Sequence, residues 1–326
     1  MGADTVDWGI IGAGDVCERK GGPPLYQVAG CRLVGVTRRN RERGEDYARR
    51  HGPCRYFASV EALLDETAIG AVYVATPPER HAEHTEASAR AGRHVLCEKP
   101  MAMDAGECRR MVDVCAAEGV VLGVAYYRRC YPSILRAKAL LDDGAVGRLE
   151  RMWLNDEFPA SHRLDLVHLF CGDVLSVAAR TEALPPGSHA AEGPVLHADT
   201  ASGAQAVMNV GWQETGAPEQ VALEGSEGRI AVDDIKGGSL VWTRDGEERR
   251  EACAPLPWTH WGLVENFCDH LLDGAPLACD GEAGRKSTVV LDVVSLLVPD
   301  GPALAVDYEA PPRPDHSRGT GLGLLA

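Results

Sequence analysis

A glycine-rich turn near the start of the chain has the residue types that bind nucleotide phosphates. The run GIIGAGDVC places Gly12 and Gly14 in the first two positions of a G-x-G-x-x-G pattern and Cys17 in the third. The first glycine allows a tight turn, and the second lets the backbone approach a pyrophosphate. We therefore predict a dinucleotide site, with an accidental glycine-rich turn as the alternative. The predicted contacts here are Gly12, Gly14, Asp15 and Val16.

The residues after the second predicted strand bear on which dinucleotide is bound. NAD needs an acidic residue there for the ribose 2′-hydroxyl, whereas the 2′-phosphate of NADP needs positive charge. The sequence continues with Thr37, Arg38 and Arg39, and no carboxylate occurs before Glu42. Arginine pairs with phosphate through two hydrogen bonds and stacks on adenine. We predict NADP, with NAD less favoured; the other interpretation is a solvated helix start in an arginine-rich chain.

Two further turns follow predicted strands, at the edge where ligands bind in open α/β sheets. One begins with Thr76 and Pro77, and the other contains Glu98 and Lys99 within an E-K-P tripeptide. Only 5 of the 33 basic residues are lysines, so a lysine in this setting is distinctive. We add these four residues to the predicted cofactor site.

Together these motifs resemble those of the Gfo/Idh/MocA oxidoreductase family. The resemblance rests on the glycine-rich opening, the A-T-x-P turn and the run AGRHVLCEKP, and it continues through YYRRCYP and DGAVG. It implies hydride transfer between a nicotinamide cofactor and a polar small molecule. By this resemblance Lys99 contacts ribose and substrate and takes part in proton transfer. Burial near the positive nicotinamide should lower its pKa; a plain salt bridge with Glu98 is the alternative.

The family's second catalytic element is a histidine in H-x-x-D-L, which the resemblance places at His162 with Asp165 three residues later. On a helix the two share a face, so the carboxylate can fix the imidazole or contact a substrate hydroxyl. A surface histidine at a helix start is the alternative. The sequence departs from the family at Phe158, where an aspartate is expected; Asp156 and Glu157 are candidate substitutes.

Three more side chains match substrate-facing positions of the family. Tyr127 and Arg129 lie in a predicted interdomain turn, where they can bind hydroxyls or an anionic group; core packing is the alternative for Tyr127. His260 lies beside two tryptophans before a helix, and aromatic packing around that helix start is its alternative. No CxxC pair or HExxH motif occurs, so we predict no metal site and reduced cysteines.

The elements that position these residues follow two different patterns. Up to residue 125, short apolar runs alternate with helical patterns, which is typical of βαβ units in a doubly wound parallel sheet. The predicted strands are 6–11, 32–36, 71–75, 94–97 and 120–124. Alternating apolar and polar residues then predict an open, mainly antiparallel sheet. Its predicted strands are 149–154, 204–210, 220–223, 229–232 and 240–243.

These patterns predict an α/β protein with three parts. They are an NADP-binding Rossmann domain (1–125), a substrate-binding and oligomerisation α/β domain (126–309) and a flexible tail (310–326). The 326 residues carry a formal charge of −15, which repels nucleic acid and anionic membrane surfaces. The absence of a leader or a spanning segment predicts a cytoplasmic protein. We expect a homodimer or homotetramer formed through the C-terminal sheet.

The function predicted from the sequence is an NADP-dependent oxidoreductase. It would transfer a hydride to or from an alcohol, ketone, amine or imine carbon of a sugar-like or cyclic polar substrate. The missing aspartate leaves two alternatives open: an NADP-binding sensor or regulatory protein without turnover, or a redox-neutral enzyme that retains its cofactor.

Overall fold

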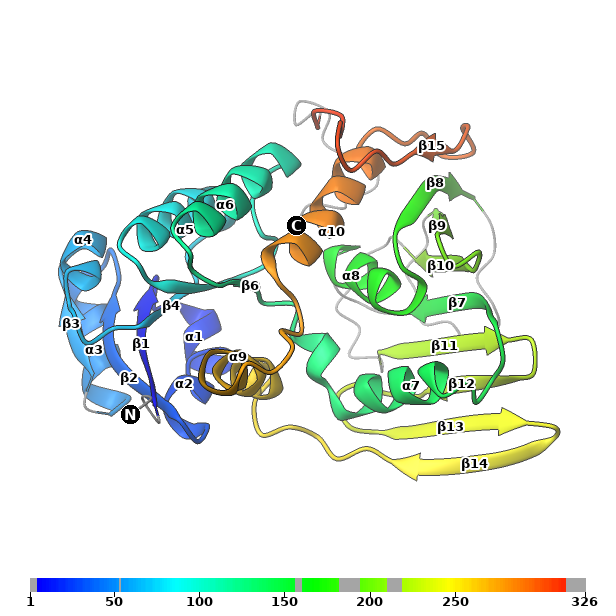
Figure 1. Cartoon of the computed structure of the whole chain (residues 1–326), viewed down its shortest axis with the longest axis horizontal. Coiled ribbons are helices and arrows are strands. Elements are labelled where there is room, and N and C mark those ends of the chain that lie inside the picture. The colour runs from blue at the N-terminus through cyan, green and yellow to red at the C-terminus, as the bar shows by residue number, and fades with distance from the viewer. Residues whose placement is uncertain (1–4, 53, 156–159, 182–193, 210–218, 315–326) are drawn as a thin grey trace. The chain divides into compact units, whose positions relative to one another are not determined.

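A computed structural model of the protein describes residues 5–52, 54–155, 160–181, 194–209 and 219–314 (Figure 1). The chain is divided into two packing units. One unit comprises 1–130 with 257–285, and the other 131–256 with 286–326. The first unit therefore includes a late segment that the domain boundaries predicted from sequence leave in the second domain. Among the described residues, no helix is long and apolar enough to cross a membrane.

A six-stranded parallel sheet forms the centre of the first unit, in the order β3-β2-β1-β4-β5-β6. Its strands are β1 (Val6–Ile11), β2 (Cys31–Thr37), β3 (Arg55–Phe57), β4 (Ala71–Val74), β5 (His94–Cys97) and β6 (Leu122–Val124). The predicted Rossmann sheet is confirmed. All four residues of β4 are buried, as expected for a strand covered on both faces. The three residues of β3 are too few to show a period, so the sequence did not predict this strand.

Helices alternate with the strands of this sheet. They are α1 (Asp15–Arg19), α2 (Pro24–Gln27), α3 (Arg41–Arg50), α4 (Val60–Leu64), α5 (His81–Arg90), α6 (Ala105–Ala117) and α9 (Trp261–Asp273), with 3₁₀ turns η1 (Pro78–Arg80) and η2 (Tyr127–Cys130). The side chain of Asp104 caps α6 by accepting from the Glu107 backbone N–H at 2.8 Å. Gly92 follows α5 with a φ of +71°, as a C-terminal glycine should.

The segment Gly21 to Pro24, which leads from α1 into α2, is buried. A Cβ at Gly21 would collide with the hydroxyl of Tyr73. A glycine is therefore needed at this position to let the Tyr73 hydroxyl approach the backbone.

Helix α9 packs against β1 and α2, although both of these elements lie far from α9 in the sequence. The ring of Phe267 in α9 lies 5.4 Å from that of Trp8 in β1, and both side chains are fully buried. Apolar positions at helical spacing, Leu263, Val264 and Phe267, form the buried face. This helix is thus part of the core of the nucleotide-binding unit.

The second unit is built on a nine-stranded, mainly antiparallel sheet in the order β14-β13-β12-β11-β7-β10-β9-β8-β15. Its strands are β7 (Leu149–Asn155), β8 (Val174–Arg180), β9 (Val195–Thr200), β10 (Gln205–Asn209), β11 (Gln220–Gly225), β12 (Gly228–Val232), β13 (Ser239–Arg244), β14 (Glu247–Ala252) and β15 (Leu304–Ala305). Helices α7 (Pro132–Asp142) and α8 (Ala160–Cys171) pack on it, and α10 is Gly281–Val294. Strand β14, EERREA, lacks apolar alternation, which explains why the sequence did not predict it.

Candidate functional site

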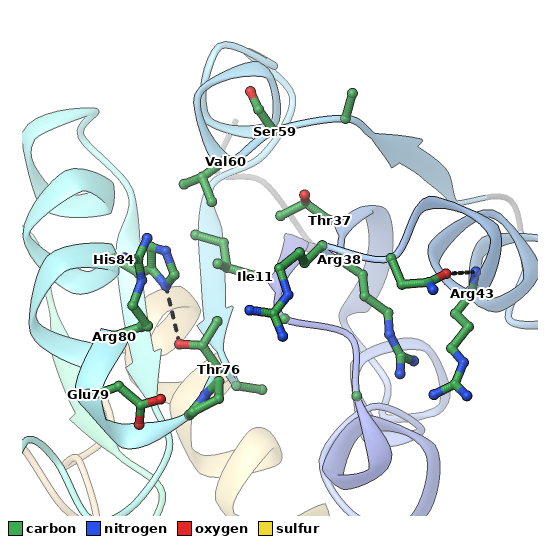
Figure 2. A pocket seen from close by; sticks show the side chains of 17 residues that line it. Ile11, Thr37, Arg38, Arg43, Ser59, Val60, Thr76, Glu79, Arg80 and His84 are labelled. Carbon is green, nitrogen blue, oxygen red and sulfur yellow. Dashed lines mark hydrogen bonds between the residues drawn. The ribbon is translucent and has the colours of Figure 1, made fainter.

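A cavity of about 840 Å³ opens at the carboxyl edge of the parallel sheet, where β1, β2 and β4 end. Figure 2 shows Arg38 and Arg43 on one side of this cavity and Thr76, Glu79 and His84 on the other. Its size lies within the usual range for small-molecule and cofactor sites. Seven of the predicted cofactor residues line it: Gly12, Gly14, Thr37, Arg38, Arg39, Thr76 and Pro77.

The glycine turn after β1 is held by backbone hydrogen bonds. The N–H groups of Gly12 and Ala13 donate to the Thr37 carbonyl at 3.0 and 3.2 Å. Gly12 has a φ of +91°, and a Cβ there would lie 2.9 Å from the backbone nitrogen of Thr76. At Gly14 a Cβ would meet only the Gly12 carbonyl, at 3.7 Å. Gly12 is therefore needed for the turn itself, whereas Gly14 keeps the cavity wall open.

Three arginines at the cavity lack a carboxylate partner. Within the described residues, no carboxylate oxygen lies within 4.0 Å of the side chains of Arg38, Arg39 or Arg43. By contrast, the nearby Arg41 pairs with Glu45 at 2.7 Å and does not line the cavity. Positive charge is thus left available at the carboxyl end of β2.

The position of Arg38 is fixed by the glycine turn. One of its guanidinium nitrogens donates to the Ala13 carbonyl at 2.8 Å. The lining carboxylate Glu79 lies on the opposite wall and pairs with none of these arginines. The side chains around β2 therefore offer guanidinium donors that could bind an anionic group.

A second cavity, of about 170 Å³, adjoins the first, since Ala75 and Thr76 line both. It contains the E-K-P turn and two of the predicted substrate residues. Its other lining residues are Val16, Lys20, Pro78, His81, Glu98, Lys99, Tyr127 and His260. Asp15 lines neither cavity; it is exposed, with Arg19 at 3.7 Å.

Lys99 contributes the amine of this second cavity. No carboxylate of the described residues lies within 4.0 Å of its Nζ, so the structure does not contain the alternative salt bridge with Glu98. Burial lowers the pKa of Lys99, and the charges of Lys20 and Arg128 lower it further, against the opposing effect of Glu98. A lowered pKa makes the protonated amine a stronger acid than an ordinary lysine side chain.

Glu98 is bound by a network that the sequence did not predict. Its Oε1 accepts from the Tyr73 hydroxyl at 2.5 Å and lies 2.7 Å from His260 Nε2. Its Oε2 accepts from the Lys99 backbone N–H at 3.1 Å. Burial alone would raise the pKa of Glu98, but His260, Lys99 and the Tyr73 hydroxyl lower it to about 2. The buried carboxylate is therefore ionised and holds the backbone of the E-K-P turn in place.

His260 and Tyr127 form one wall of this network. Their ring centroids are 4.5 Å apart, and their side chains are 1% and 4% exposed. His260 precedes α9, so the late segment of the first unit delivers it to Glu98. Both side chains pack against each other and also line the second cavity.

Arg129, which the sequence predicts to bind substrate, does not line either cavity. Its guanidinium donates to the Ala278 carbonyl at 3.0 Å.

His81 joins the two turns that line the second cavity, and no sequence motif marks it. Its ring nitrogens lie 2.7 Å from the Thr76 carbonyl and 2.9 Å from the Pro100 carbonyl, and the side chain is fully buried. His84 is also buried, and its Nδ1 lies 3.2 Å from the Thr76 hydroxyl oxygen.

Tyr73 was not predicted as a site residue. The signal available for it was a residue with a hydroxyl group in the otherwise apolar run AVYV.

The second predicted catalytic element lies in the other packing unit. His162 and Asp165 are both in α8 and both fully buried, so a surface role for His162 is wrong. Their catalytic roles remain predictions. The departure at Phe158, with Asp156 and Glu157, lies outside the described residues. Among those that are described, no group of three or more histidine, cysteine or acidic residues is arranged to hold a metal ion.

Comparisons with known proteins agree with this arrangement. Residues 6–126 match the model of an oxidoreductase family with an NAD-binding Rossmann fold, Gfo/Idh/MocA. Oxidoreductase P35 of Formosa agariphila is 39% identical over 144 residues, which is 44% of this chain and 45% of the relative. This alignment thus spans less than half of that protein. Inositol 2-dehydrogenase of Rhizobium meliloti is 27% identical over 88% of this chain and 95% of its own length.

A solved structure extends the similarity of fold to both units. The WlbA dehydrogenase of Bordetella pertussis, in complex with NADH and UDP-GlcNAcA, has a TM-score of 0.76 and 22% identity over 94% of this chain and 99% of its own. The motifs, the strand order and the matched family model lead to the same conclusion. Residues 6–126 match the NAD-binding Rossmann domain of the Gfo/Idh/MocA oxidoreductase family.

Proposed function

We propose that this protein is an NADP-dependent oxidoreductase that acts on a sugar-like or cyclic polar substrate. The observation that carries the proposal is the pair of adjoining cavities at the sheet edge. The larger has Arg38, Arg39 and Arg43 without carboxylate partners, and the smaller has the amine of Lys99. The relatives support the substrate class, because they include an inositol dehydrogenase and a dehydrogenase solved with a sugar nucleotide.

The residues of the larger cavity fit NADP. Gly12 and Gly14 would admit the pyrophosphate, and Arg38 and Arg39 would hold the 2′-phosphate. When bound, the nicotinamide would supply or accept the hydride. On the protein side, Lys99 Nζ would hold the proton exchanged with the substrate oxygen or nitrogen. Glu98 would position Lys99, and His162 would assist the proton transfer. Asp165, Tyr127, Arg129 and His260 would bind or orient the substrate.

Cofactor choice is tested by the double variant Arg38→Ala/Arg39→Asp. It removes the phosphate-binding charge and adds a carboxylate at the end of β2, so KM for NADPH should rise by roughly 10- to 100-fold while KM for NADH changes little. Arg41→Ala is the matched control, since Arg41 is paired and lies outside the cavity. Equal effects of the double variant on both cofactors would contradict the assignment.

The catalytic role is tested at Lys99. Lys99→Ala should lower kcat by about 10²- to 10⁴-fold, the usual contribution of general acid–base catalysis, while NADPH still binds. Lys99→Arg keeps the charge but cannot release a proton near neutral pH, so it should also lose turnover. Undiminished turnover in either variant would rule out Lys99 as the proton donor.

A substrate screen separates the proposed hydride-transfer enzyme from the two alternatives, a redox-neutral enzyme and a sensor without turnover. Ketoses, inositols, nucleotide-linked sugars and cyclic imines are offered with NADPH, and absorbance at the nicotinamide band is followed together with product by mass spectrometry. Net oxidation of NADPH supports the proposed reaction. Product without a net absorbance change favours the redox-neutral enzyme, and tight NADPH binding without any product favours the sensor.

A further inference from the structure

Two cysteines from distant parts of the first unit lie in contact. Cys31 is the first residue of β2 and Cys268 lies in α9, and they are 237 residues apart in the chain. Their Sγ atoms are 2.9 Å apart, about 0.9 Å more than the ~2.05 Å of a disulfide bond. Both are free thiols in this structure. A small movement of the two side chains would therefore allow a covalent bond.

The chemistry of Cys31 differs from that of other thiols in the chain. Burial raises the pKa of Cys54 to about 11 and that of Cys115 to about 12, which keeps both protonated and unreactive. The pKa of Cys31 is lowered instead, because the Cys268 thiol can donate a hydrogen bond to its sulfur. Cys31 is only half-buried, whereas Cys268 is 1% exposed. The pair thus combines a half-buried cysteine of lowered pKa with a second thiol in contact with it.

We propose that Cys31 and Cys268 form a redox-modification site that a hydroperoxide converts into an intramolecular disulfide. In the first step the Cys31 thiolate attacks the peroxide, giving a sulfenic acid and releasing an alcohol or water. In the second, the Cys268 sulfur attacks the Cys31 sulfur, the S–S bond forms, and the oxygen leaves as water. Two thiols lose two electrons and two protons, and the peroxide is reduced by the same two electrons.

The bond would tie the start of β2 to α9. It closes a very long loop, so it should stabilise the first unit by constraining the unfolded chain. Cys31 begins β2, whereas the nucleotide cavity contains Thr37 at the other end of that strand. Oxidation should therefore raise the melting temperature without weakening nucleotide binding. A dithiol reductant should reverse the effect.

The experiment treats the reduced full-length protein with hydrogen peroxide at substoichiometric to tenfold excess and maps its peptides without reduction. We expect one peptide pair joined through Cys31 and Cys268 with the loss of two hydrogen atoms. We also expect oxidation to raise the melting temperature by several degrees, and dithiothreitol to return it to the value of the reduced protein. Cys31→Ser and Cys268→Ser should lack both effects, whereas Cys54→Ser, at another half-buried thiol, should retain them.

The outcomes that overturn the proposal are equally specific. Cys31 found as sulfinic or sulfonic acid with Cys268 still free would show that Cys268 does not resolve the sulfenic acid. A disulfide between other cysteines, or between two molecules, would place the reaction elsewhere. Both thiols free after treatment would show that the contact is not oxidisable. Wild-type mapping decides these cases even if a serine variant fails to fold.

Discussion

At the scale of single residues, the candidate site depends on how one buried carboxylate is satisfied. Glu98 receives the Tyr73 hydroxyl, the Lys99 backbone N–H and the His260 ring, and it forms no ion pair with the Lys99 amine. This leaves the Lys99 amine without an ion-pair partner among the described residues, while burial lowers its pKa. Both observations support the proposal that Lys99 exchanges a proton with the substrate.

The same network makes a prediction about pH and stability. The pKa of Glu98 is lowered from 4.5 to about 2, so its ionised form stabilises the fold above pH 4.5, and this contribution is lost as the pH falls toward 2. Glu98→Gln should cost roughly 3 kcal/mol of unfolding free energy at neutral pH. The difference from wild type should shrink in acid. Urea unfolding at several pH values measures it.

A matched control separates this effect from general charge loss. Glu83 is exposed on α5, so Glu83→Gln should change the unfolding free energy by less than about 0.5 kcal/mol at any pH. A Glu98→Gln deficit that stays constant from neutral to acid pH would show that the Glu98 charge does not stabilise the fold.

Sequence patterns predicted some of these residues and missed others for a physical reason. Lys99 and Glu98 follow a strand at a recognisable tripeptide, and their neighbourhood could be inferred from topology alone. Tyr73 and His81 carry no motif, because their roles come from the hydrogen bonds they make across the fold. The surroundings of His260 in the sequence marked it as a candidate. Its contact with Glu98 could not be predicted, because the two residues are 162 positions apart in the chain.

At the scale of elements, the turn after β1 contains two glycines that are needed for different reasons. Gly12 needs its positive φ and the close approach of Thr76, whereas Gly14 has an ordinary φ of −105° and open space beside it. The sequence motif marks both positions without separating the demands of folding from those of binding. The structure separates them.

Paired alanine substitutions test that distinction. Gly12→Ala should destabilise the protein by more than about 2 kcal/mol, because left-handed backbone strain adds to a collision with Thr76. Gly14→Ala should leave the melting temperature nearly unchanged and weaken NADPH binding by roughly tenfold or more, since its methyl group would enter the cavity. Thermal melts and fluorescence titrations measure both. A Gly14→Ala variant that binds NADPH normally would contradict this division.

Elements with a strong period were predictable, and those without one were not. Strands β1 and β5 have the bounds that their apolar runs predict. Strand β14 lies at a sheet edge, so its charged side chains face water and give no alternation.

At the scale of the whole molecule, the second sheet presents a row of residues suited to self-association. The register places Trp153, Ala222, Ala231 and Val241 side by side across four strands, all half-buried. Neighbouring residues Met152 and Leu154 point to the opposite, buried face. We propose that this row forms the interface of the expected homodimer or homotetramer.

Size-exclusion chromatography with light scattering tests the interface. Trp153→Glu would place a charge at the position of the largest side chain of the row, and we expect it to give a monomer that keeps its circular dichroism spectrum. Trp153→Phe retains an aromatic surface and should preserve the oligomer. A wild-type protein that runs as a monomer at micromolar concentration would refute the proposed interface.

The return of α9 to the first unit bears on how the protein is made. Trp8 is synthesised almost at once, but Phe267, which covers it, leaves the ribosome only after residues 131–256 have emerged. Domains generally fold as units, amino-terminal first, during synthesis. Here the nascent Rossmann sheet must wait, with Trp8 uncovered and Glu98 without its His260 contact, until residues 257–285 have been made. Chaperone demand should therefore persist until residues 257–285 have emerged from the ribosome.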